Sequence, residues 1–242
     1  MIGLYLGDCL EKMCEIEDQS VDLVLCDLPY GLTACKWDSV IPLDLLWEQY
    51  KRVCKPNAAI VLTASQPFTS RLIASNFDAF KYEWIWRKSR ATGFLQSKFM
   101  PMKNHENICV FCFSGKPTFN PQKTDGHKPT NSAIGYGHSP TFGASKLRVY
   151  KGGDTTRNPV TVQDFKSERG LHPTQKPVQM MEYLINTYSN IGDVVLDNCM
   201  GSGASGVAAV MTGRRFIGIE RDERFFEIAR SRIASYSKIK SE

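Results

Sequence analysis

The sequence predicts an α/β fold built on a mostly parallel sheet. Short apolar runs alternate along the chain with segments whose apolar residues recur at helical spacing, and this alternation is typical of strand–helix–strand units. Two of the apolar runs end at polar turns, Asp27–Gly31 and Asp197–Gly203. Because ligands of such sheets sit beyond the carboxyl ends of the strands, we expect a site at these turns.

The first half of the chain contains five expected strands and three expected helices. VDLVLC (21–26) and AIVLTA (59–64) are apolar on both faces, as strands in the middle of a parallel sheet are. Residues 43–53 carry apolar side chains at helical spacing and stop before Lys55-Pro56-Asn57. The remaining strands are expected at 3–6, 82–86 and 106–114, and the remaining helices at 9–16 and 67–75.

Regular patterning disappears between residues 115 and 170, which are rich in Gly, Pro, Ser, Thr and Lys. A loop of this length inside a compact domain is usually functional. Order returns after Pro177, which suits the first turn of a helix over 178–189. Strands are then expected at 193–197 and 215–220, and helices at 201–211 and 222–236.

Charge is unevenly distributed along the 242 residues, although the net charge is only +5. Residues 84–170 hold fourteen Lys or Arg and five Asp or Glu, whereas the rest of the chain holds sixteen and twenty. A basic middle segment is expected of a surface that meets phosphates, and equally of a solvated loop.

Other bulk features exclude some classes of protein. No apolar run is long enough for a membrane span, and the N-terminus lacks the basic start of a signal peptide, so we expect a cytoplasmic protein. The eight cysteines are then expected to be reduced. Cys109 and Cys112 form a C-x-x-C, but within a strand they would lie on opposite faces, and no metal site is expected.

A glycine-rich turn predicts a cofactor site. DVVLD (193–197) runs into Asn198-Cys199-Met200-Gly201-Ser202-Gly203 and then a helix of small residues. The glycines let the backbone approach a ligand closely. Glu220, at the end of the next strand, could accept hydrogen bonds from both hydroxyls of a ribose. The pattern indicates a cofactor containing adenosine without specifying which one, and a tight turn without a ligand is the alternative.

Asp27-Leu28-Pro29-Tyr30-Gly31 suits chemistry on an exocyclic amine. The lone pair of such an amine is delocalised into the ring. The carboxylate of Asp27 and the carbonyl of Leu28 could accept its two N–H bonds and free the lone pair for attack. Pro29 fixes the turn, and Tyr30 could stack on a base that has left the duplex. An ordinary turn at the end of a strand is the alternative.

These motifs resemble those of β-class DNA amino-methyltransferases, and the length of the chain resembles that of the small phage- or bacterial-type enzymes of this class. Asp27–Gly31 resembles the D-P-P-Y motif with Leu28 in place of proline, and residues 198–203 resemble the F-x-G-S-G loop with Cys199 in place of phenylalanine. His172–Pro177 (H-P-T-Q-K-P) is similar to the segment before the helix beside the cofactor. The order of the three motifs is that of the β class.

The resemblance implies a Rossmann-like methyltransferase sheet in circularly permuted order, mostly parallel with one antiparallel strand. It implies one domain over 1–242, with an irregular target-recognition insertion at about 87–170. The cofactor would be S-adenosyl-L-methionine, and Lys176 and Thr174 would contact its methionine carboxylate. Asp8 would lie near its adenine, and the remaining candidate cofactor contacts are Asp197, Asn198, Cys199, Gly201, Ser202, Gly203 and Glu220.

The resemblance implies double-stranded DNA as the partner. No association with a membrane is expected, and a homodimer is a further expectation. The target would be adenine N6, flipped out of the duplex, in a restriction–modification type of activity. The candidate DNA contacts are Arg87, Lys88, Arg90, Lys98, Lys128, Lys146, Arg148 and Arg157.

Three alternatives remain open from the sequence. Methylation of cytosine N4 is the nearest, and Asp27 rather than serine at the head of its motif favours adenine. A nicotinamide-dependent oxidoreductase would account for the glycine turn but leaves Asp27–Gly31 and the basic middle segment unexplained. A DNA-binding protein without enzymatic activity is the third.

Overall fold

The computed structural model describes residues 2–32, 38–135, 138–139, 143–144, 148–168, 170 and 175–239. It divides into a main unit, Met1–Asn120 with Thr161–Glu242, and a small unit, Pro121–Val160. The small unit falls inside the region 87–170 in which the sequence predicts target recognition. None of the helices in the described residues is both long and apolar enough to cross a bilayer.

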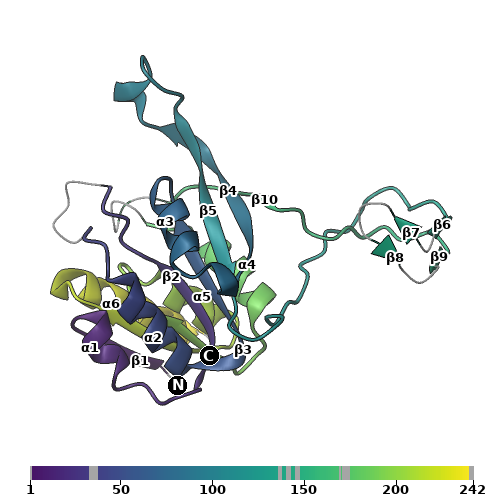
Figure 1. Ribbon diagram of the computed structural model, residues 1–242. Coiled ribbons are helices and arrows are strands. Elements are labelled where there is room, and N and C mark those ends of the chain that lie inside the picture. Colours follow the sequence, from purple (N-terminus) through teal and green to yellow (C-terminus); the bar gives the residue numbers. More distant parts are fainter. Residues whose placement is uncertain are drawn as a thin grey trace. The chain divides into compact units, whose positions relative to one another are not determined.

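The main unit is built on one eight-stranded sheet (Figure 1). Its strands, in spatial order, are β1 (Ile2–Leu6), β12 (Arg215–Glu220), β11 (Val194–Asp197), β2 (Val21–Asp27), β3 (Cys54–Ala64), β5 (Lys103–Phe111), β4 (Phe80–Thr92) and β10 (Val162–Phe165). β5 runs antiparallel to both of its neighbours, and every other neighbouring pair is parallel. The predicted sheet, mostly parallel with one antiparallel strand, is therefore confirmed.

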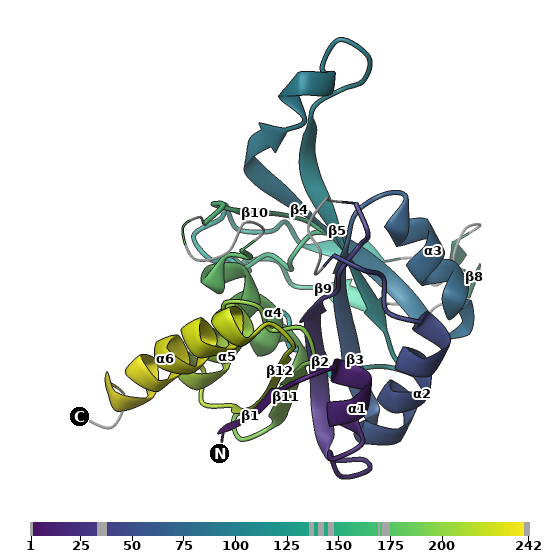
Figure 2. The same ribbon diagram turned by 90° about the vertical axis from the view of Figure 1, so that its left-hand side faces the viewer.

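Helices cover both faces of the sheet, as Figure 2 shows. One face carries α1 (Cys9–Met13), α2 (Leu43–Val53) and α3 (Phe68–Ser75), and the other carries α4 (Val178–Tyr188), α5 (Ala204–Met211) and α6 (Glu223–Ile239). Alternate residues of the central strands divide between the two cores, for example Val24 and Ile60 on one side and Leu23 and Val61 on the other. All four are fully buried, which explains why these strands read as continuous apolar runs.

Outside the middle of the chain each expected element is present, although the ends of several differ, as in β3, which begins at Cys54 and not at Ala59. The helix 43–53 and the strand 215–220 have the expected bounds. The stretch 115–170 was expected to lack regular structure, but it contains β10, an edge strand that pairs with β4. Only Phe165 of its four residues is buried, so the strand leaves almost no apolar signal in the sequence.

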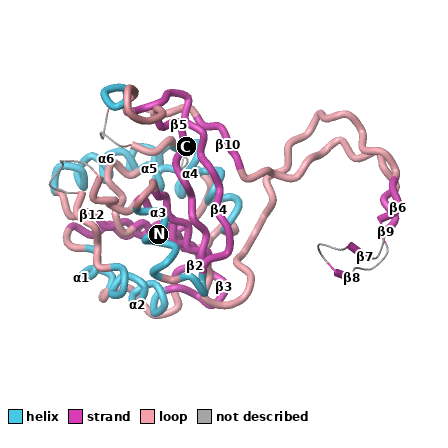
Figure 3. Tube along the Cα trace, turned by 45° about the horizontal axis from the view of Figure 1, so that its top comes forward, coloured by secondary structure: helices cyan, strands magenta, loops and turns pink. Residues whose placement is uncertain are grey.

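Strands β4 and β5 continue past the edge of the sheet as a hairpin (Figures 1 and 3). Their pairing extends from Phe80 with Phe111 as far as Thr92 with Lys103. The short helical turn η2 (Phe94–Gln96) lies in the connection, and η1 (Phe77–Ala79) precedes β4. The hairpin belongs to the main unit, because β4 and β5 are strands of its sheet.

The small unit contains two short antiparallel pairs, β6 (Ala133–Gly135) with β9 (Arg148–Tyr150) and β7 (His138–Ser139) with β8 (Gly143–Ala144). The main unit holds the two residues at which the chain leaves it and returns. The Asn120 N–H donates to the carbonyl of Thr187 at 2.7 Å, and the carbonyl of Thr161 accepts from the Ile85 N–H at 2.8 Å.

Candidate active site

A cavity of about 350 Å³ lies in the main unit where strands β1, β2, β11 and β12 end. These four strands are parallel, so their carboxyl ends meet at one edge of the sheet. The structure thereby brings the predicted acid-led turn and the predicted glycine turn into one cavity. The predicted catalytic and cofactor-binding residues that line it are Asp8, Asp27, Leu28, Pro29, Tyr30, Lys176, Asp197, Asn198, Cys199, Gly201, Ser202 and Glu220.

The carboxylate of Asp27, at the end of β2, is held on both of its oxygens. Oδ1 accepts hydrogen bonds from the hydroxyls of Tyr30, at 2.7 Å, and Thr63, while Oδ2 accepts from Lys176 Nζ at 2.6 Å. The ring of Tyr30 stacks on Phe68 with centroids 5.4 Å apart. Burial raises the pKa of the Tyr30 hydroxyl well above its usual value, so this group acts as a hydrogen-bond donor. The network fixes the rotamer of Asp27.

Lys176 belongs to a chain of alternating charges across the cavity wall. Its ammonium lies 3.3 Å from Glu106 Oε2, and Lys88 pairs with the other oxygen of Glu106. Glu106 Oε2 is buried and accepts no well-aligned hydrogen bond within the described residues. Burial alone would lower the pKa of Lys176, but the carboxylates of Asp27 and Glu106 outweigh it and raise the pKa, so the ammonium stays charged.

The glycine turn is folded by the side chain of Asp197. Its carboxylate accepts hydrogen bonds from the Cys199 N–H, at 3.1 Å, and from the Ser205 hydroxyl. Burial raises the pKa of Asp197 to about 7. Asn198 is also buried and accepts a hydrogen bond from the Tyr50 hydroxyl at 2.7 Å. Both side chains therefore hold the turn in shape beside the cavity.

Glu220 joins the glycine turn to the end of β12. Its two oxygens accept from the N–H groups of Gly201 and Asp222, each at 2.8 Å. A carboxylate oxygen has a second acceptor site, so Glu220 could also accept hydrogen bonds from ribose hydroxyls. Asp8, after β1, caps helix α1 by accepting from the Leu10 N–H at 2.9 Å. Residues of three strand ends could thus hold the adenosine part of a cofactor.

Gly203 does not line the cavity, and Thr174 lies outside the described residues. Gly203 has φ +77°, and a Cβ there would come within about 3 Å of Ala229 on α6. Its lack of a side chain lets α6 pack closely and leaves the cavity untouched.

Sequence reasoning missed Glu106, although it lines the cavity and touches both Lys176 and Lys88. A signal was present, because Glu106 is a charged residue two positions before the apolar run Ile108–Phe111 of β5. Thr63, which donates to Asp27, sits inside the apolar run of β3 and gave no such signal.

The predicted DNA contacts have different surroundings. Arg87 forms a two-bond ion pair with Asp164, and Lys88 lies in the cavity wall. Arg157, in the small unit, donates to the carbonyls of Lys128, Asp154 and Thr156. Arg90, Lys98 and Lys128 are exposed. Lys146 and the side chain of Arg148 lie outside what the structure describes.

The arrangement in the cavity is that of an α/β methyltransferase, and comparison with known proteins identifies the family. The model of the N6/N4 DNA methylase family matches residues 21–231, which is most of the chain. The chain therefore belongs to this family of DNA methylases. The nicotinamide-dependent oxidoreductase, one of the alternatives from the sequence, is thereby excluded.

Curated relatives cover nearly the whole chain. Type II methyltransferase M.HinfI of Haemophilus influenzae is 28% identical over 94% of this chain and 67% of its own length. The DNA adenine methyltransferase YhdJ of Escherichia coli K12 is also 28% identical, over 94% of this chain and 81% of its own.

Solved structures share the fold. The M1.HpyAVI complex with SAM has a TM-score of 0.67 at 23% identity and covers 96% of this chain and 99% of that one. The PvuII cytosine-N4-specific DNA methyltransferase has a TM-score of 0.71 at 13% identity, covering 98% and 91%. The predicted Rossmann-like methyltransferase fold is confirmed.

Proposed function

We propose that this DNA methylase transfers a methyl group from S-adenosyl-L-methionine to N6 of an adenine flipped out of double-stranded DNA. The observation that carries the proposal is the single cavity shared by Asp27 and the glycine turn with Glu220. Asp27 can accept a hydrogen bond from the target amine, and the glycine turn with Glu220 can bind a nucleotide-like cofactor.

Asp27 and Leu28 are proposed to bind the target amine. An acceptor on each N–H draws the nitrogen toward tetrahedral geometry and localises its lone pair for attack on the methyl carbon. Tyr30 and Thr63 hold the Asp27 carboxylate so that no reorientation is needed during the reaction. The amine loses its proton to water after the transfer.

The glycine turn, Glu220 and Asp8 are proposed to hold the cofactor, whose sulfonium supplies an already activated methyl group. The positive φ of Gly201 (+51°) belongs to a backbone that can approach a ligand closely. Lys176 was expected from the family resemblance to contact the methionine carboxylate. Since its ammonium bonds to Asp27 in this structure, we assign it to the amine-binding side of the cavity.

Adenine is favoured over cytosine by two considerations. Asp27 stands at the head of its motif where serine would favour cytosine, and the relative YhdJ is named as an adenine methyltransferase. The fold does not separate the two, since the PvuII enzyme is cytosine-specific.

Mass spectrometry of nucleosides from DNA incubated with the protein and S-adenosylmethionine tests the proposal. We expect N6-methyladenine, and N4-methylcytosine in its place would overturn the choice of base. Asp27→Ala should abolish transfer while retaining cofactor binding. Asp18→Ala is the control, because it breaks only an exposed ion pair with Arg52. Transfer at the normal rate by Asp27→Ala would refute the role assigned to Asp27, whereas DNA binding by the wild-type protein without any transfer would support the non-enzymatic alternative.

Two further expectations belong to this proposal. The homodimer follows from the family resemblance, and light scattering at assay concentration tests it. The relatives YhdJ and M.HinfI come from bacteria, where DNA lies in the cytoplasm, and we propose the same location here.

A further inference from the structure

The β4–β5 hairpin carries large apolar side chains at its tip, which we define as Thr92–Met102. Phe94, Leu95 and Phe99 are 75%, 94% and 86% exposed, and Met100 and Met102 are exposed as well. Contiguous apolar groups in water mark a surface that another molecule covers. No described residue of the main unit covers these side chains.

The tip is a folded turn that presents these side chains in a fixed arrangement. Gly93 adopts φ +89°, in the left-handed region that favours glycine, and starts the 3-10 turn of Phe94–Gln96. The carbonyl of Gln96 then accepts from the N–H groups of Phe99 and Met100, at 2.9 and 3.1 Å. Thr92 pairs with Lys103 and closes the turn.

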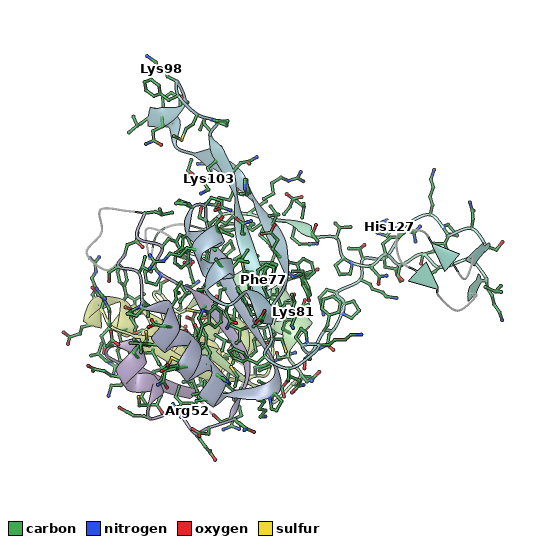
Figure 4. All side chains as sticks on the ribbon, in the orientation of Figure 1. Arg52, Phe77, Lys81, Lys98, Lys103 and His127 are labelled. Atoms are coloured by element: carbon green, nitrogen blue, oxygen red, sulfur yellow. The ribbon has the colours of Figure 1, made fainter. Side chains whose placement is uncertain are left out.

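The charge around the tip points to a polyanionic partner. Residues 88–105 contain four Lys or Arg and no Asp or Glu. Lys98 lies at the end of the hairpin and Lys103 nearer its base, as Figure 4 shows. Cations beside exposed apolar groups match a DNA duplex, which has phosphates outside and apolar base faces inside.

The same hairpin forms part of the cavity wall, through residues below the tip and through Thr92 at the start of the tip. Lys88, Thr92, Lys103 and Glu106 all line the cavity that contains Asp27. A duplex whose flipped base entered this cavity would therefore lie against the hairpin. This continuity favours DNA over a membrane or a second copy of the chain as the partner.

We propose that the hairpin tip inserts apolar side chains of Phe94, Leu95 and Phe99 into the duplex beside the flipped adenine. The inference rests on the proposed function. Flipping a base costs about a few kcal/mol of lost stacking and pairing. Apolar wedges between base steps offset part of that cost in proteins that kink DNA. Arg90 and Lys98 hold the flanking phosphates.

The variant F94A/L95A/F99A tests this inference on two duplexes. One has the target adenine paired with thymine, and the other has it opposite an abasic site, where it is already unpaired. We expect kcat/KM to fall about tenfold or more on the paired duplex and about threefold or less on the abasic one. The control F77A/I191A, at two exposed apolar residues outside the hairpin and the cavity, should change both by less than about twofold.

Other outcomes would overturn the inference. An equal loss on both duplexes, with cofactor affinity and thermal stability unchanged, would exclude a role in flipping. Conversion of a wild-type dimer to monomers by the triple variant would show that a second copy covers the tip. If the wild-type protein made no N6-methyladenine on either duplex, the proposed function itself would fail, and the inference with it.

Discussion

Lys176 and Asp27 form a partly buried ion pair, with Lys176 Nζ 2.6 Å from Asp27 Oδ2 and the two side chains 5% and 23% exposed. A carboxylate that is shielded from water without its counter-ion is expensive. Lys176→Met would leave Asp27 in that state and would leave Glu106 with Lys88 as its ion partner. We expect it to lower the free energy of unfolding by about 2 kcal/mol or more, measured by urea denaturation. Lys55→Met, which breaks the more exposed pair with Asp22, should cost about 1 kcal/mol or less. Equal costs for the two variants would contradict the prediction.

Glu106→Gln removes the negative charge of one of the two carboxylates that contact Lys176. With Glu106 neutral, the lysine is attracted to Asp27 alone, and the target amine must displace it from Oδ2. We expect kcat to fall about tenfold, equivalent to about 1.4 kcal/mol, with cofactor affinity within about twofold of normal. Single-turnover methylation and equilibrium cofactor binding give the two values. A variant with normal kcat would show that Lys176 leaves Asp27 without help from Glu106.

Asp197 should make stability fall as pH rises. Its pKa is raised to about 7 in the folded protein, above its value in the unfolded chain, so the folded state binds more protons between about pH 4 and 7. The contribution of protonated Asp197 to the free energy of unfolding is complete below pH 4. It is lost as the pH rises through 7, and the loss is at most about 4 kcal/mol. Asp197→Asn cannot titrate. Its stability relative to the wild-type protein should therefore increase between pH 5 and pH 8 in urea titrations, and a constant difference would refute the assignment.

Gly206→Ala should destabilise the protein through overpacking. A Cβ at Gly206 would lie 2.4 Å from Ile233 Cδ1 and 2.8 Å from Phe216 Cε1. We expect a loss of about 1–3 kcal/mol in unfolding experiments. In the double variant G206A/I233A the shortened side chain at position 233 makes room for the new methyl group. Its loss of stability should therefore be smaller than the sum of the losses in the two single variants. Strict additivity of the two losses would mean that the close approach to Ile233 is not the cause.

The sequence predicted the fold because its central strands are buried on both faces and its helices alternate with them. The sheet residues Leu23 and Val24 show this, since neighbouring positions point into different cores. The insertion was less predictable. β10 is an edge strand with one buried residue, and its identity depends on pairing with β4, which no local pattern encodes.

The site was predictable where residues cluster in sequence and unpredictable where folding joins distant segments. The acid-led turn and the glycine turn were found from their motifs. The pairing of Lys176 with Asp27 joins residues 149 positions apart, and Glu106 joins them from a third segment. The resemblance of the motif predicted that Lys176 lies near the cofactor. A motif describes residues that are adjacent in sequence and gives no information about ion partners from distant segments.

The attachment of the small unit has a consequence for how such a chain diversifies. Its two ends are secured to the main unit by main-chain hydrogen bonds, at Asn120 and Thr161, which require no particular side chain within residues 121–160. Insertions, deletions or wholesale exchange of that stretch leave both attachments intact. A lineage can therefore remodel this part of its surface without disturbing the packing around Asp27.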